Sequence, residues 1–370
     1  MTSDIFKNLS KIIEQESKTS TYKFALIRGT IELIQENTPY IEVKKGRVYM
    51  PMGLLINKWI FYYYPLIESP SNIPQIYGPR SIAFERELKE IIADYHYKGE
   101  SSVLYKDIRT MNLVKNSENK LINLYTKLQK TISTMPMKYL GTSISKLHYS
   151  IYQYHAVLNN AQKENKSDFV SGYGTFSIPA DYFEAFRILG SFINGQESII
   201  NKWAEFSWKC TGNEAKSKSV IISKLLDNPI TERQANESKL IFRKLHKETG
   251  RIECVWSGKQ IYNLDSFDLD HLLPFAVWRN NDLWNLLPAS SKINKQKSDS
   301  IPSPARIENA KPMILKYWRQ LQHINKNRFN REIEQALLGG EMSNEWEEIG
   351  ISQLKQHAEY LIKDRGYEHW

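Results

Sequence analysis

Cysteine is almost absent from this sequence, since the 370 residues include only Cys210 and Cys254. This scarcity excludes a disulfide framework as the main source of stability. Long apolar runs are missing too, because the longest, residues 52–67, is interrupted by polar residues and by Pro65, and is too broken to span a bilayer. The first residues carry charges where a secretion signal has its apolar region. We therefore expect a cytoplasmic protein that does not contact a membrane.

Acidic residues are the scarcer charged type. The chain has 41 Asp and Glu against 50 Lys and Arg, which gives a net charge of +9 and a pI of about 9.1. Such an excess favours a polyanionic partner, although charge alone is weak support for one. The patterns predict a mainly α fold in four regions. These are a helical N-terminal region 1–165 for DNA or partner binding, a helical connector 166–230, a compact region 231–304, and helices 305–370 that pack on it.

Apolar residues at helical spacing account for most of the chain. We expect helices over residues 4–16, 22–35, 53–64, 84–97, 103–111, 121–132, 144–158, 232–247, 305–325, 329–338 and 349–362. Pro65 is expected to end the helix over 53–64. The aromatic residues of that helix, Trp59 among them, are more plausible as core than as a platform for stacking bases.

A β-hairpin is the clearest strand signal in the first half of the chain. Residues 40–51 alternate around Lys45 and Gly46, and the hairpin tip carries Lys44, Lys45 and Arg47. Two helices followed by a basic hairpin suggest a start similar to a winged helix. The tip then either contacts nucleic acid or is an ordinary solvated turn, and the sequence favours neither.

A denser pattern of chemistry-bearing residues lies further along, in residues 267–303. Its first part is a short apolar run around Asp270 and His271, which predicts a buried strand that ends in a loop. The polar residues 280–282 indicate a loop. Residues 284–287 form a second apolar run, which we expect Pro288 to end.

A short helix is expected to follow this second strand. Ser290 or Ser291 is a suitable N-cap, and the helix carries lysines and one amide. Those side chains are Lys292, Asn294, Lys295 and Lys297. Strand, loop, strand and helix, with Asp-His first and Asn-x-x-Lys last, form the outline of a ββα-metal unit.

The segment 267–303 resembles an HNH endonuclease domain, in the variant whose final His is replaced by Asn. It is particularly similar to the HNH domain of the RNA-guided CRISPR type II effector nucleases. The Asp-His pair, the middle Asn285, the late Asn294 and the following Lys297-Ser298-Asp299 fall at the family spacing. The N-terminal region has no resemblance of this kind.

The resemblance implies a role for five residues of the segment. Asp270 and Asn294 hold one Mg²⁺ (or Mn²⁺), a hard cation that prefers oxygen ligands. His271 is the general base, because a neutral imidazole can accept a proton from an attacking water near neutral pH. Asn285 orients the loop so that His271 points correctly, and Lys297 contacts a phosphate.

Further basic residues are candidates for contact with the nucleic-acid backbone. They are Lys292 and Lys295 beside the site, and Lys44, Lys45 and Arg47 at the hairpin tip. Many HNH domains also hold a structural zinc through two Cys-x-x-Cys pairs. Here Ser257 stands where the partner of Cys254 would be, and no second pair follows, so no structural zinc is expected.

The function predicted from these features and the resemblance is hydrolysis of DNA phosphodiester bonds, with RNA less favoured, and the resemblance implies 5′-phosphate and 3′-hydroxyl ends. By analogy with the family, the chain would be the effector nuclease of a bacterial anti-phage defence or restriction system. No P-loop is present, so a nucleotide-driven step would require a sensor or ATPase subunit. A self-contained sequence-specific restriction enzyme and an inactive nucleic-acid-binding or assembly subunit are the alternatives. One site cuts one strand, so a double-strand break needs a homodimer or two successive events.

Overall fold

The computed structural model divides the chain into two compact units, Met1–Pro229 and Ile230–Trp370. It describes residues 5, 7, 8, 11, 19–70, 73–97, 100–140, 151–157, 165–193, 199–211, 217–230, 236–262 and 267–370. Most of the first expected helix, over residues 4–16, lies outside this part of the chain. Among the residues that the structure describes, no helix is long and apolar enough to cross a membrane.

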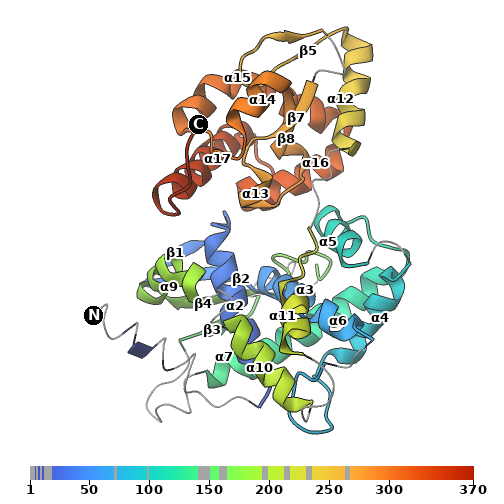
Figure 1. Ribbon diagram of the computed structural model, residues 1–370, viewed down its shortest axis with the longest axis vertical. Helices are drawn as coiled ribbons and strands as arrows, with labels where there is room; N and C mark the ends of the chain where they lie inside the picture. Colours follow the sequence, from blue (N-terminus) through green and yellow to red (C-terminus); the bar gives the residue numbers. More distant parts are fainter. Residues whose placement is uncertain are drawn as a thin grey trace. The chain divides into compact units, whose positions relative to one another are not determined.

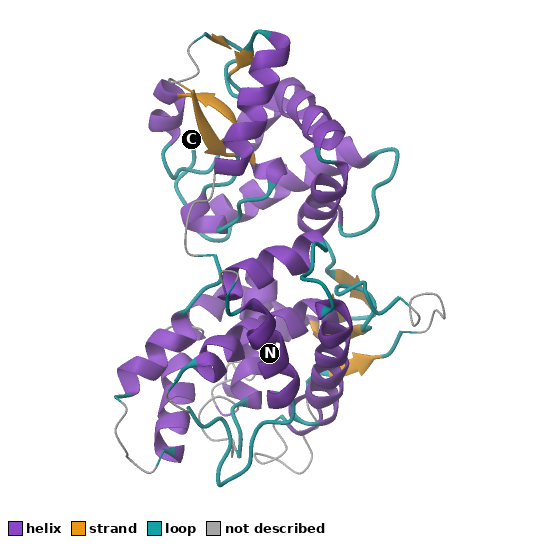
Figure 2. Ribbon diagram, turned by 90° about the vertical axis from the view of Figure 1, so that its right-hand side faces the viewer, coloured by secondary structure: helices purple, strands orange, loops and turns teal. Residues whose placement is uncertain are grey.

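Helices dominate both units, as the sequence predicts (Figures 1 and 2). In the first unit they are α2 (Tyr22–Gln35), α3 (Met52–Glu68), α4 (Glu85–Tyr95), α5 (Glu100–Thr110), α6 (Ser117–Thr134), α7 (Pro136–Tyr139), α9 (Ala180–Ile193), α10 (Asn201–Cys210) and α11 (Lys218–Leu226). The expected end of α3 at Pro65 is wrong, because the helix continues for three more residues. Pro65 has no N–H to donate to the Phe61 carbonyl, and the helix ends within one turn after it.

The expected hairpin is present and belongs to a larger sheet. Strands β1 (Glu42–Lys44) and β2 (Arg47–Pro51) pair around Lys45 and Gly46, both of which have positive φ, as a two-residue hairpin turn requires. β2 also pairs with β4 (Thr175–Pro179), so the strand order is β1-β2-β4-β3. The hairpin is therefore half of a four-stranded sheet and not a separate two-stranded wing.

The last strand of this sheet corrects a helix prediction. Residues 153–155, expected at the end of a helix over 144–158, form β3 (Gln153–His155) and pair with β4. Residues 144–150 and 158 of that expected helix lie outside the described residues. Because β4 follows residue 165 and completes the sheet of β1 and β2, the expected first region and connector form one unit.

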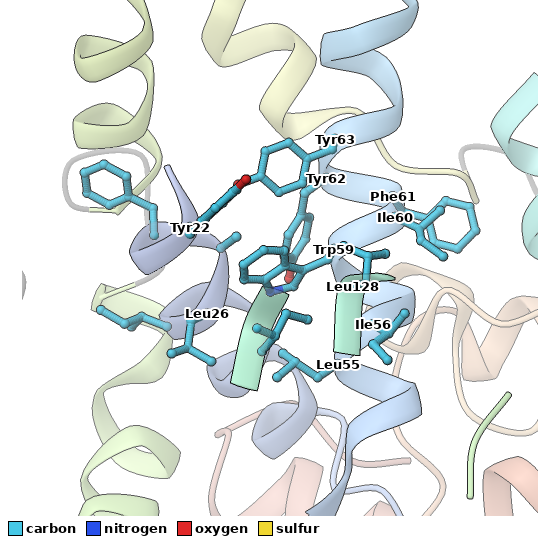
Figure 3. Packing of buried hydrophobic residues seen from close by; sticks show 14 of the residues in the cluster. Tyr22, Leu26, Leu55, Ile56, Trp59, Ile60, Phe61, Tyr62, Tyr63 and Leu128 are labelled. Carbon is cyan, nitrogen blue, oxygen red and sulfur yellow. The ribbon is translucent and has the colours of Figure 1, made fainter. Parts of the chain in front are cut away.

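The core of the first unit contains aromatic rings of α2 and α3 packed beside aliphatic side chains such as Leu55 and Leu128 (Figure 3). The ring of Trp59 lies 5.6 Å from that of Tyr22 and 5.7 Å from that of Tyr63. Tyr63 shares a buried hydrogen bond of 2.8 Å with Thr21, and Trp203 of α10 stacks at 6.4 Å on Phe24. Trp59 is fully buried, so its prediction as a core residue is confirmed.

The second unit contains small sheets surrounded by helices. Its elements are α12 (Asn236–Thr249), β5 (Ile252–Glu253), β6 (Gln260–Ile261), β7 (Phe267–His271), α13 (Phe275–Trp278), η2 (Leu283–Asn285), β8 (Leu286–Ser290), α14 (Ser291–Lys297), α15 (Pro304–Ile324), α16 (Lys326–Ile333), η3 (Glu334–Leu338) and α17 (Trp346–Lys363). The indole N–H of Trp318 in α15 donates to the backbone oxygen of Trp284 at 2.8 Å. Both indoles are fully buried, so α15 and the segment before β8 share one core.

Strand β8 extends past the expected stop at Pro288. It pairs antiparallel with β7, and Pro288 lies opposite Leu269. The Pro288 carbonyl accepts a hydrogen bond of 2.8 Å from the backbone N–H of Val255, outside the β7–β8 ladder. The backbone of Pro288 therefore faces away from β7, and its missing N–H removes no bond from the pair.

Candidate nuclease site

The site is built on one face of β7, against α14. Side chains two residues apart on a strand point to the same side, so Asp268 and Asp270 share this face. Helix α14 begins at its N-cap Ser290, whose hydroxyl accepts from the backbone N–H of Ile293 at 3.4 Å. The Asn294 amide nitrogen donates to the Asp268 carboxylate at 3.2 Å. The helix thus brings an amide alongside the strand's carboxylates, 26 residues away in sequence.

The Asp270 carboxylate lies in a buried cluster of donors. Lys297, one turn after Asn294 on α14, places its ammonium 3.0 Å from Asp270 Oδ1 and 2.7 Å from the backbone oxygen of His271. The indole N–H of Trp256 donates to Asp270 Oδ2 at 2.5 Å. Asp270 is 2% exposed and Lys297 is fully buried. A buried carboxylate and a buried ammonium are stable only as partners of this kind.

His271 occupies the last position of β7, and strand alternation turns its ring away from the face of Asp270. Its Nε2 lies 3.2 Å from Asn281 Oδ1, and the ring lies 5.5 Å from the ring of Phe275. A bond of Nε2–H to the amide oxygen fixes the tautomer that donates from this nitrogen. Asn281 was expected only as a loop residue, so its contact with the imidazole adds to the predicted set.

Asn285 ties together the loop between the strands. Its Oδ1 accepts from the backbone N–H of Leu273 at 2.8 Å, and its amide nitrogen donates to the backbone oxygens of Leu273 at 3.1 Å and Asn280 at 3.4 Å. The side chain is fully buried. These bonds fix the backbone on both sides of the segment that contacts His271. That this geometry orients the imidazole for catalysis stays a prediction.

The same loop is held from α16 by a buried acidic residue. The backbone N–H of Leu283 donates to Glu332 at 2.6 Å, and Arg328 donates to the other oxygen of that carboxyl at 2.6 Å. Burial raises the pKa of Glu332 to about 7, the nearby Asp282 carboxylate acts in the same direction, and Arg328 opposes both. The expected loop is therefore largely buried, and Asp282 is only 7% exposed.

The other predicted backbone contacts differ in their surroundings. Lys292 and Lys295 are exposed on α14, beside the site. Lys44 and Lys45 are exposed at the hairpin, where Lys44 pairs with Glu42. Arg47 donates to Ser177 Oγ at 2.9 Å and to two backbone oxygens, so its guanidinium holds β2 to β4. Its role in binding nucleic acid stays a prediction, as do those of the lysines.

The side chains present fit a hard divalent cation better than a structural zinc. Asp268, Asp270 and Asn294 supply carboxylate and amide oxygens, which are the ligands that Mg²⁺ takes. Cys254 is fully buried against the core of the second unit. Among the described residues, no group of three or more His, Cys, Asp and Glu side chains lies close enough together to hold a metal ion.

Comparison with known proteins finds a matching family model in each unit. Residues 2–225 match the family model described as domain of unknown function DUF8808, which covers more than half of the chain. The chain belongs to the DUF8808 family. Residues 254–303 match the model described as HNH endonuclease. In this member of the DUF8808 family the HNH domain thus contains β7, β8 and α14.

A curated relative supports the HNH assignment. The chain is 30% identical over 97 residues to the "CRISPR-associated endonuclease Cas9" of Streptococcus mutans serotype c (strain ATCC 700610 / UA159). The match covers 26% of this chain and 7% of that protein. The resemblance to an HNH domain similar to that of Cas9 is therefore confirmed, and the substrate of such a nuclease domain is nucleic acid.

Proposed function

We propose that this protein is a metal-dependent DNA endonuclease whose site is formed by β7, β8 and α14. The observation that carries the proposal is the packing of α14 on β7 in a ββα unit that matches the HNH endonuclease family, with Asn294 bonded to Asp268 and Lys297 bonded to Asp270. Asp270 and Asn294 would hold one Mg²⁺, and Asp268 adds a third oxygen donor beside them. A bound Mg²⁺ supplies Lewis acidity toward the scissile phosphodiester.

The chain's own residues divide the remaining work. His271 accepts the proton of the attacking water at its imidazole, while Asn281 and Asn285 fix the ring and the loop that carries it. Lys297 compensates the charge of Asp270 from a buried position. This placement favours a role in organising the carboxylate over the direct phosphate contact that the resemblance implies. Lys292 and Lys295 remain candidates for phosphate contact, because both are exposed beside Asn294.

We further propose that the nuclease serves an anti-phage defence or restriction system, acting with a partner subunit. The similarity to a CRISPR-associated endonuclease supports this context. The first unit, which is larger than the nuclease unit, would recognise the partner or the DNA.

A plasmid cleavage assay tests the proposal. We expect Mg²⁺-dependent nicking or linearisation of plasmid DNA by the wild-type chain, with or without proteins encoded next to it, and none by His271→Ala. Cutting at one discrete site without a partner would favour a self-contained restriction enzyme. Equal behaviour of wild type and His271→Ala under every condition would contradict the proposal and indicate an inactive assembly subunit.

A further inference from the structure

Trp256 has a contact that its sequence context does not suggest. It lies in the turn after β5, and its indole N–H reaches the carboxylate of Asp270 on β7. The turn is rigid, because Val255 N–H is bonded to the Pro288 carbonyl at 2.8 Å and Gly258 N–H to the Cys254 carbonyl at 2.8 Å. These two bonds hold the turn that carries the indole beside Asp270.

The last described residues of the chain hold the indole from its other side. Trp370 meets the Trp256 ring edge-on at 5.3 Å and 82°, and the Arg306 guanidinium lies 3.7 Å from the centre of the Trp370 ring. The backbone of Trp370 is bonded to Ile301 at 2.7 Å and to Ser303 at 3.1 Å, in the segment that follows α14. Residues 368–370 therefore form a strap between the start of α15 and Trp256.

We infer that Trp256 is a positioning residue for Asp270, held in place by this strap. The inference rests on the proposed function. With Lys297 on Oδ1 and Trp256 on Oδ2, both carboxylate oxygens have a directional donor, which fixes the rotamer of the group that would hold the cation. Donors of this kind behind a metal ligand change metal affinity or activity by about 10- to 100-fold when removed. A tryptophan that only packed would not need its N–H aimed at a buried carboxylate.

Trp256→Phe separates these roles, because phenylalanine keeps the ring and removes the N–H. We expect Mn²⁺ binding to the full chain, measured by calorimetry, to weaken about tenfold or more. The Mn²⁺ concentration needed for half-maximal cleavage should rise in parallel. Trp346→Phe is the matched control: it removes an indole N–H from the same unit, against Trp318 and Phe329, and should leave Mn²⁺ affinity unchanged.

The outcomes distinguish this inference from the proposed function. Equal Mn²⁺ affinity of wild type and Trp256→Phe, or tighter binding by the variant because the indole blocks the ligand, would overturn the positioning role and leave the nuclease intact. Failure of the wild type itself to bind Mn²⁺ or to cut DNA would instead contradict the proposed function. Trp370→Leu should shift Mn²⁺ affinity in the same direction as Trp256→Phe, because it removes the support of the indole.

A second, independent observation concerns the DUF8808 unit. Residues 119–163 contain six lysines and no acidic residue, whereas the chain's average of 41 acids in 370 residues would put about five in a stretch of this length. On α6, Asn123, Lys127 and Lys130 are exposed at spacings of four and three residues, which places them on one helical face. Lys138 is exposed on α7, the helix that follows directly.

The three exposed lysines Lys127, Lys130 and Lys138 are here called the α6–α7 lysines. None of them forms an ion pair with any residue that the structure describes, whereas Arg86, Lys89 and Lys209 are each paired with a glutamate. The net charge shows the same bias. Residues 1–229 hold 29 Lys and Arg against 22 Asp and Glu, a net +7, so the remaining 141 residues contribute only +2 of the total.

We propose that the α6–α7 lysines contact the phosphate backbone of a DNA duplex. Lys127 and Lys130 lie one turn apart on α6, and Lys138 adds a third exposed charge from α7, so the three lysines can meet more than one phosphate. Charge complementarity and the nucleic-acid substrate of the HNH domain favour DNA over an acidic protein as the occupant.

The test compares the affinities of the wild type and of two triple variants of the full chain for a DNA duplex. EDTA is present, so that metal binding and cleavage are excluded. Replacing the α6–α7 lysines by Gln should lower affinity on the order of 100-fold at 0.1 M salt and reduce the log–log salt slope by about 3. The matched control replaces Arg86, Lys89 and Lys209 by Gln, which removes the same charge, and should have a much smaller effect on both quantities. Equal losses in the two triple variants, or no duplex binding by the wild type, would overturn this proposal. The plasmid assay tests nuclease activity separately.

Discussion

Removing the ammonium of Lys297 tests the electrostatics of the site directly. In Lys297→Met the Asp270 carboxylate, 3% exposed in its side chain, loses the cation 3.0 Å away and keeps the bond from the Trp256 N–H. Breaking a buried ion pair by removing one partner costs about 3–5 kcal/mol, because the remaining charge is left uncompensated. We expect a loss of this size in the unfolding free energy of the second unit.

A double variant shows how much of that loss in unfolding free energy is electrostatic. Asp270→Asn combined with Lys297→Met removes both charges, so most of the loss should be recovered and the effects of the two substitutions should be far from additive. Mg²⁺ should also stabilise Lys297→Met more than it stabilises the wild type, since a divalent cation at Asp270 replaces the missing charge. Hydrogen exchange in peptides from β7 and β8, followed in urea with and without Mg²⁺, reports on this unit alone. A loss below about 1 kcal/mol, or strictly additive effects of the two substitutions, would refute the reasoning.

Three further variants test the surroundings of the site and the first unit. Burial raises the pKa of Glu332 to about 7, so between pH 4.5 and 7 the native protein holds a proton that the unfolded chain has lost. The wild type therefore loses stability as the pH rises through this window. In urea unfolding, the stability of Glu332→Gln relative to the wild type should increase from pH 5 to 7. Burial lowers the pKa of His357 to about 4, so the stability that depends on its neutral form is lost as the pH falls from 6.5 to 4. The unfolding free energy of His357→Gln should increase relative to the wild type by about 3 kcal/mol over that range. Plots of unfolding free energy against pH that run parallel for variant and wild type would contradict the assignment in either case. Gly53→Ala would place a Cβ 2.0 Å from the Phe169 carbonyl and should lower the Tm by several degrees, whereas Gly340→Ala, with open space around it, should not.

Local signals in the sequence were sufficient for much of the fold. The alternation around Lys45 and Gly46 predicts the first hairpin, because a two-residue turn with positive φ is a property of those residues themselves. The N-cap at Ser290 and the helix that follows are equally local. The strand at residues 153–155 could not be identified in this way, because its partner β4 is about twenty residues further along the chain.

The parts of the site that sequence could not supply are also non-local. Asp270, His271, Asn285 and Asn294 follow from spacing within one segment. The contact of Trp256 depends on a backbone bond between its turn and β8, which no residue pattern announces. The burial of Asn280 and Asp282 likewise depends on α16, whose Glu332 bonds to the backbone of this loop and which the local composition does not indicate.

We propose that Asp270 and Asn294 together hold one divalent cation. Calorimetric titration of the full wild-type chain with Mn²⁺, repeated with Asp270→Ala and Asn294→Ala, measures this binding. We expect a single Mn²⁺ site in the wild type that is lost in both variants. Absence of Mn²⁺ binding by the wild type, or a site that both variants retain with unchanged affinity, would contradict it.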